Sequence, residues 1–272
     1  MKKEEFGNLI FIPAIYSAGI SLAIFEAIQE LHKFNNNSQF MIFSLAIFVI
    51  IIAEILVNYI IRSKAVVINM DFTDEVNEVA HLFNKIVIPL ALYASIIGFG
   101  YYNLGSNVLG IVLALTFILF FILFINIRAF FQNKIDVESK THFVYDFFKF
   151  IIFFLGADVI INFSSDSFPK LAIGLFTLSF VLELLLITRQ KHILRRYYLY
   201  AFIASLVEVS ACQGLILLNR LNSLQIALCL VFIFYLSLAI IQHAITRTLT
   251  RSVIIEYVLV LLIALSILLG VS

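Results

Sequence analysis

Residues 107–129 read NVLGIVLALTFILFFILFINIRA, and this uninterrupted apolar run decides the class of fold. No charged residue occurs in it before Arg128. A helix of about 20 apolar residues, rising ~1.5 Å per residue, crosses the ~30 Å hydrocarbon core of a bilayer. The run therefore predicts a transmembrane helix. Its lack of charge favours a helix on the outer, lipid-facing side of the protein.

Similar runs recur along the whole chain. The 272 residues are 62% hydrophobic and 13% charged, whereas soluble domains average roughly 25% charged residues. We therefore predict an all-α polytopic bundle that forms a single transmembrane domain over residues 1–272. Nine spans are expected, at about residues 6–28, 39–62, 84–104, 107–129, 145–163, 168–188, 197–219, 222–246 and 250–271.

The distribution of basic residues predicts the orientation. Cytoplasmic loops are enriched in Lys and Arg. With nine spans and the N-terminus inside, all of the 18 Lys and Arg residues except Lys33, Lys170 and Arg220 fall on the cytoplasmic side. The C-terminus then lies outside. We expect the protein to be integral to a prokaryotic plasma (inner) membrane.

Several function classes lack support in the sequence. A net charge of +1 gives no basic field for nucleic acid. No nucleophile elbow, His-Glu-x-x-His motif or phosphate-binding loop is present, so an intramembrane enzyme has no supporting motif. Cys212 and Cys229 lie inside apolar runs, where a thiol behaves as a small hydrophobe. We expect no cofactor and no metal site.

The most informative residues are acids within the predicted spans. An ionisable group in hydrocarbon costs about 2.5 to 3.5 kcal/mol and is a functional candidate by default. Counted along the helix from the nearest basic residue, Glu54, Asp158 and Glu208 lie about 12 to 18 Å deep. No Lys or Arg is expected at their depth. Glu183 and Glu256 are shallower, and we interpret them as structural.

Neighbouring residues suggest how these acids are placed. Asn58 and Asn162 each follow an acid by four residues, so acid and amide share a helical face. Glu208 lies on a stripe of small residues that predicts close packing inside the bundle. Glu54, Asn58, Asp158, Asn162 and Glu208 are therefore the candidates for a proton or cation site. The alternative is that each acid is protonated and hydrogen-bonded across helices, which would only stabilise the bundle.

A second candidate surface precedes the third predicted span. Residues 72–83 have an apolar face and an acidic face, which predicts a short amphipathic helix at the inner membrane surface. Asp74, Glu75, Glu78 and His81 lie off its apolar face. Anionic lipid would repel such a face. We therefore regard these four residues as candidates for docking a protein partner or a cation.

Two functions remain open from the sequence. The first is a small permease or proton/cation-coupled carrier that uses the buried acids. The second is a non-catalytic membrane subunit or scaffold that docks a membrane or cytoplasmic protein through the amphipathic helix and the basic inner loops. The expected partners are the lipid bilayer and, according to the function, a proton, a small cation or a protein.

Overall fold

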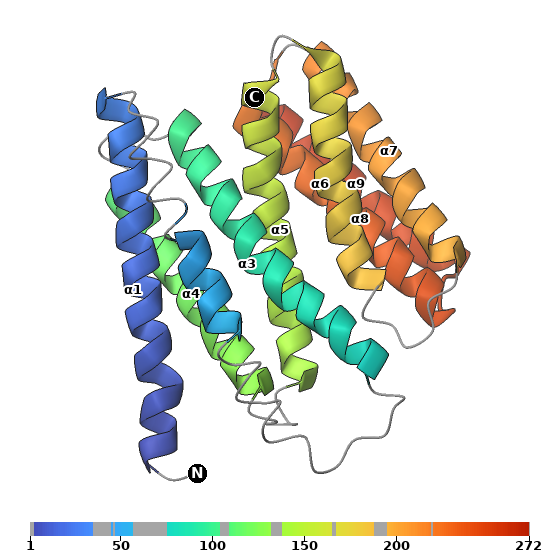
Figure 1. The fold of residues 1–272 in the computed structure, drawn as a ribbon. Helices are drawn as coiled ribbons and strands as arrows, with labels where there is room; N and C mark the ends of the chain where they lie inside the picture. The colour runs from blue at the N-terminus through green and yellow to red at the C-terminus, as the bar shows by residue number, and fades with distance from the viewer. Residues whose placement is uncertain are drawn as a thin grey trace. The chain divides into compact units, whose positions relative to one another are not determined.

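The structure is a computed structural model that describes residues 3–34, 45, 47–56, 75–103, 109–131, 138–164, 167–187, 195–218 and 220–271. All regular structure in these ranges is helical (Figure 1). Besides a short helix at Ile47–Leu56, the helices are α1 (Lys3–Phe34), α3 (Glu75–Asn103), α4 (Leu109–Phe131), α5 (Glu138–Phe163), α6 (Phe168–Ile187), α7 (Arg195–Leu217), α8 (Ser223–Thr246) and α9 (Arg251–Val271). The predicted helical bundle is therefore confirmed.

Five helical segments in the described ranges are long and apolar enough to cross a membrane. They are Phe11–Gln29, Lys85–Asn103, Phe168–Leu185, Arg196–Leu217 and Ser223–Thr246. Shorter apolar helices occupy Ile47–Leu56 and Val112–Arg128. The helices lie at or close to the predicted apolar runs. The count of nine spans and their orientation remain predictions.

The third helix differs from the expectation of a separate surface helix at residues 72–83. α3 begins at Glu75 and continues without a break to Asn103, with Pro89 inside it. Glu75, Glu78 and His81 therefore belong to the first turns of a long helix. Pro89 therefore lies within the helix without ending it. Asp74 lies outside the described residues.

The chain divides into two compact units, Met1–Phe148 and Lys149–Ser272, which we describe separately. In the first unit α1 and α4 lie side by side, and α3 contacts both (Figure 1). Phe120, Phe124 and Ile127 of α4 are fully buried. Tyr16 of α1 meets Phe124 edge to face, with ring centroids 6.4 Å apart. α4 thus buries one face, whereas Leu115 and Ile118 of the same helix are exposed. Its place on the lipid-facing side of the bundle remains a prediction.

In the second unit, residues 149–163 of α5 join α6, α7 and α8 in a ring of four helices. α5 packs on α6 at Gly174, where a Cβ would lie 3.0 Å from Cγ2 of Ile160. α6 packs on α7, and α7 on α8. Phe234 of α8 stacks on Phe153 of α5 with a centroid distance of 4.2 Å, which closes the ring. α9 contacts α8.

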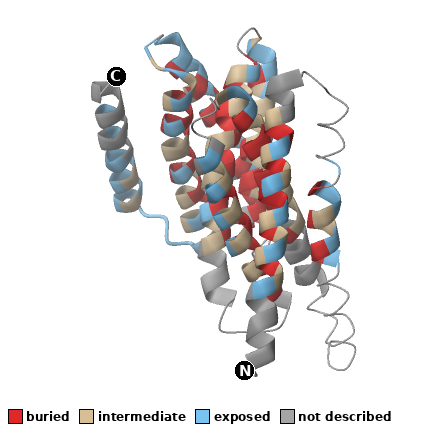
Figure 2. Ribbon diagram, turned by 90° about the vertical axis from the view of Figure 1, so that its left-hand side faces the viewer, coloured by how far each residue is buried: buried red, intermediate tan, exposed pale blue. Residues whose placement is uncertain are grey.

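The buried face of α7 follows the helical repeat. Ala201, Ser205, Glu208 and Cys212 are buried, at spacings of three and four residues. Small side chains allow the neighbouring helix to approach closely. As the small-residue stripe predicted, this face points into the bundle, whereas Phe202, Leu206 and other apolar residues of α7 are exposed. Figure 2 shows how buried and exposed positions alternate along the helices.

The ends of α8 are fixed by local hydrogen bonds. Asn222 and Gln225 form a capping box, in which the side chain of each accepts from the backbone N–H of the other. At the other end, Arg247 adopts a left-handed conformation with φ of 58°. His243 then contacts Thr248 through Nδ1 at 2.7 Å and Tyr257 of α9 through Nε2 at 3.2 Å. The turn between α8 and α9 is thereby defined.

Candidate functional site

The most strongly polar part of the second unit lies between α6 and α7. Ser179 and Glu183 are four residues apart on α6, and Ser205 and Glu208 are three apart on α7. These spacings place each serine and glutamate on one face of its helix. All four side chains are fully buried. We call these four residues the Ser–Glu cluster.

Hydrogen bonds connect the Ser–Glu cluster in a row. Ser205 Oγ donates to Glu183 Oε2 at 3.1 Å, and Ser179 Oγ donates to Glu208 Oε2. The two serine oxygens lie 3.2 Å apart. A continuous path therefore runs from Glu183 through Ser205 and Ser179 to Glu208. Because α6 and α7 are antiparallel, each serine lies opposite the glutamate of the other helix.

Part of the cluster has no donor. Oε1 of Glu183 and Oε1 of Glu208 are buried, and neither meets a donor in hydrogen-bonding geometry among the residues that the structure describes. The carboxyl group of Glu208 also interacts with the Ser237 hydroxyl of α8. Among the described residues, the two buried carboxyl groups therefore interact with three hydroxyl groups, those of Ser179, Ser205 and Ser237. Such a site accommodates a proton more readily than two full negative charges.

Ser237 connects the cluster to a cavity. A cavity of about 340 Å³ lies between α7 and α8, with Ser237 in its wall and apolar side chains such as Ile203, Val207 and Ile240 around it. The opposite end is lined by Tyr200, Ala244 and Leu249. The same serine thus faces the carboxyl group of Glu208 and the cavity.

Of the acids predicted for the site, Glu208 lies in the cluster, and its partner is Glu183. The sequence interpretation had set Glu183 aside as shallow and structural, because depth was counted along one helix only. In the structure Glu183 is fully buried. The overlooked signal was a serine placed one turn before a glutamate on two consecutive helices.

Asp158 and Asn162 lie one turn apart on α5, as expected. Asp158 is fully buried. The Asn162 amide donates to the backbone carbonyl of Asp158 at 2.9 Å and to the Ser223 hydroxyl of α8 at 3.2 Å. Asn162 therefore links α5 to α8, and this amide is directed to the backbone of Asp158.

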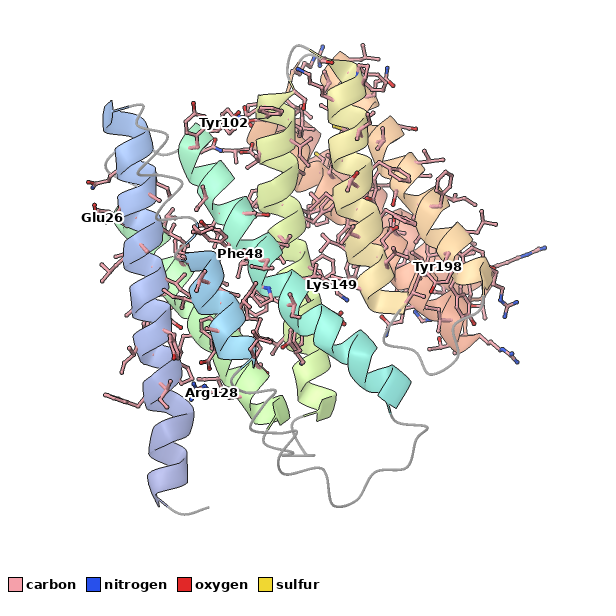
Figure 3. All side chains as sticks on the ribbon, viewed as in Figure 1. Glu26, Phe48, Tyr102, Arg128, Lys149 and Tyr198 are labelled. Carbon is pink, nitrogen blue, oxygen red and sulfur yellow. The ribbon has the colours of Figure 1, made fainter. Side chains whose placement is uncertain are left out.

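Glu54 lies in the first unit and has a cationic partner. Arg128, labelled in Figure 3, donates from Nε to Glu54 Oε1 at 2.5 Å, and both side chains are buried. The expectation that Glu54 lacks a positive partner at its depth was wrong. Arg128 lies in the last turn of α4, and its long side chain carries the guanidinium group to the carboxylate of Glu54. Asn58 lies outside the described residues.

The remaining candidates can be placed only in part. Glu75, Glu78 and His81 belong to the first turns of α3. Among the described residues, no group of three or more His, Cys, Asp or Glu side chains is arranged to hold a metal ion. Cys212 and Cys229 are free and buried.

These features define an all-helical protein with several apolar helices of membrane-spanning length and a buried carboxyl pair. Residues 33–271 match the family model described as "Protein of unknown function (DUF5656)", and the chain belongs to this family. No curated protein and no solved structure matches the chain. The matched range contains the whole Ser–Glu cluster, so the function has to be argued from the chemistry of that cluster.

Proposed function

We propose that this chain is an integral protein of a prokaryotic plasma membrane and acts as a small proton-coupled carrier, with the Ser–Glu cluster as its proton site. The observation that supports the proposal is the row of hydrogen bonds between Glu183 and Glu208 through Ser205 and Ser179. The cluster lies in the interior of a ring of helices, three of which are long and apolar enough to cross a membrane.

One proton completes the hydrogen bonds along this row. A hydroxyl group donates one hydrogen and accepts others. With the proton on Glu183, that carboxyl donates to Ser205, Ser205 donates to Ser179, and Ser179 donates to the ionised Glu208. Reversal of the two hydroxyl groups moves the proton to Glu208. The row therefore holds one proton in two ways, on Glu183 or on Glu208.

A second proton is also accommodated. With both carboxyl groups neutral, each donates to the serine opposite it, and Ser179 donates to Ser205. Ser205 then donates to the backbone carbonyl of Ala201, which lies 2.9 Å away. The net charge changes from minus one to zero between these states. A buried site whose charge differs between two protonation states can bind a transported solute with a different affinity in each state, as coupled transport requires.

The cavity beside Ser237 supports access to the cluster. Ser237 interacts with Glu208 and lines the cavity, so a proton has a hydroxyl relay between the carboxyl pair and the cavity. The first unit contributes differently, because Glu54 is neutralised by Arg128. For this reason we assign the proton site to Glu183 and Glu208. Asp158 and Asn162 are secondary candidates on α5.

Proton flux into liposomes tests the proposal. The purified protein is reconstituted with an internal pH dye, and an imposed proton gradient is applied to wild type, Glu183→Gln, Glu208→Gln and the double variant. We expect proton flux in wild type and its loss in all three variants. Glu256→Gln on α9, where the side chain is exposed, is the matched control and should retain flux. Glu54→Gln and Asp158→Asn are measured alongside.

Absence of flux in wild-type protein, or full flux in the double variant, would overturn the carrier proposal. In that case the scaffold alternative makes its own prediction. A membrane or cytoplasmic protein should co-purify with the chain, and its recovery should be lost when Asp74, Glu75 and Glu78 are each replaced by Lys.

A further inference from the structure

The cavity between α7 and α8 has a composition suited to an acyl chain. Its volume is about 340 Å³, and its wall is apolar except for Ser237 and the hydroxyl group of Tyr200. Ile203, Val207 and Ile240 line it along its length. Ligand cavities in proteins start at roughly 300 Å³ and are mostly apolar with a few polar groups. The volume is sufficient for part of one hydrocarbon chain.

Three arginines lie close in the chain to residues that line one end of this cavity. α7 and α8 are antiparallel along the cavity, so Tyr200 and Ala244 line the same end. Arg196 lies one turn before Tyr200 on α7, Arg247 follows Ala244 at the end of α8, and Arg251 begins α9. All three arginines are exposed. Side chains ending in nitrogen project from this end of the unit beside the labelled Tyr198 (Figure 3).

The surroundings match the interface between lipid headgroups and hydrocarbon. Tyr198 and Tyr200 are partly exposed beside Arg196, and tyrosine is enriched at this depth of a membrane. Arginine binds phosphate through paired hydrogen bonds. Glu256 of α9 adds one negative charge near the three arginines, so the net charge of this end stays positive. An apolar cavity that ends at three arginines is complementary to an amphiphile with an anionic head.

We propose that the α7–α8 cavity binds one acyl chain of an anionic phospholipid, whose phosphate group contacts Arg196, Arg247 and Arg251. Leu249 lies in the turn between α8 and α9 and lines the cavity. The proposal concerns lipid binding alone and does not depend on proton transport. According to the proposal, the lipid occupies one defined site on the protein.

The absence of tryptophan from the chain provides a clean test. Leu249→Trp places one indole reporter in the cavity wall, and Ile173→Trp places a control reporter on the exposed side of α6. Each protein is reconstituted in phosphatidylcholine vesicles containing an equal fraction of brominated phosphatidylglycerol or brominated phosphatidylcholine. Bromine on the acyl chain quenches indole fluorescence on contact.

We expect the Leu249→Trp reporter to be quenched several-fold more by the anionic lipid, and the Ile173→Trp reporter to be quenched equally by both lipids. Replacement of one arginine by Gln, in the Leu249→Trp background, should lower the quenching preference for the anionic lipid by about five-fold at most. This is the contribution of one basic residue at an anionic membrane surface. Replacement of all three should remove it.

A cavity-filling variant separates binding in the cavity from simple surface attraction. Ala204 lines the cavity, and Ala204→Phe should remove the quenching preference while the arginines remain. Circular dichroism and gel filtration verify that each variant is folded. Equal quenching by both lipids at the Leu249→Trp position would overturn the proposal. A preference that persists in Ala204→Phe would also overturn it.

Discussion

Arg128 on α4 donates a hydrogen bond from Nε to Oε1 of Glu54, and the two residues are 74 positions apart in the chain. Both side chains are buried. The pair attaches the short helix Ile47–Leu56 to the α1–α4 pair. The desolvation of two buried charges offsets much of their attraction, so the pair contributes little net stability. Removal of one partner is costly, because the other charge then stays buried without compensation.

Removal of one partner should therefore be more harmful than removal of both. We expect Glu54→Leu or Arg128→Met alone to destabilise the protein by about 3 to 5 kcal/mol, because an uncompensated charge remains in the interior. The double variant should lose less than either single variant. Unfolding in detergent, followed by circular dichroism, measures the difference. Additive losses in the double variant would show that the pair contributes no coupling.

Ser205 should be important for stability as well as for the proton site. Its hydroxyl group bonds Glu183, and its removal leaves a buried carboxyl oxygen without a donor. We expect Ser205→Ala to cost about 1 to 3 kcal/mol in the same unfolding assay. Ser210→Ala is the control on the same helix, because Ser210 is exposed and its hydroxyl group donates to the backbone carbonyl of Leu206. A similar loss in both variants would contradict this role of Ser205.

The close approach of α5 and α6 at Gly174 can be tested by adding a methyl group. A Cβ at this position would lie 3.0 Å from Cγ2 of Ile160. We expect Gly174→Ala to destabilise the protein by about 1 to 3 kcal/mol through overpacking. Gly19→Ala should be neutral or stabilising by up to about 1 kcal/mol, because nothing lies near that position.

Ile160→Ala removes the atoms that a methyl group at Gly174 would meet. The Gly174→Ala/Ile160→Ala double variant should therefore lose less stability than the two single losses added together. Strict additivity would show that the two helices do not meet at this position in the folded protein.

The helices of this architecture follow from the sequence, because long apolar runs form helices however those helices pack on one another. The inward face of α7 was predictable from the small residues around Glu208. The partner of that acid was not, since the pairing of Glu208 with Glu183 depends on the register between α6 and α7. The pairing of Glu54 with Arg128 depends on helices far apart in the chain. Depth counted along a single helix cannot reveal either contact.

The orientation in the membrane is predicted from the distribution of Lys and Arg in the loops. Labelling of single cysteines tests this prediction. Cys212 and Cys229 are buried and are first replaced by Ala. In that background Gln190→Cys should be protected from an impermeant maleimide applied to whole cells, because basic loops stay inside. Leu221→Cys, in the turn before α8, should be labelled. The reverse pattern would contradict the orientation that we predict.

The central claim is that Glu183 and Glu208 hold a proton inside a lipid-embedded helical bundle. Infrared spectroscopy tests it most directly, because a protonated carboxyl group has a C=O stretching band that an ionised one lacks. At neutral pH in lipid, we predict such a band in wild type and its reduction in both Glu183→Gln and Glu208→Gln. A wild-type spectrum without the band, or a band unchanged in the Glu183→Gln/Glu208→Gln double variant, would contradict the account.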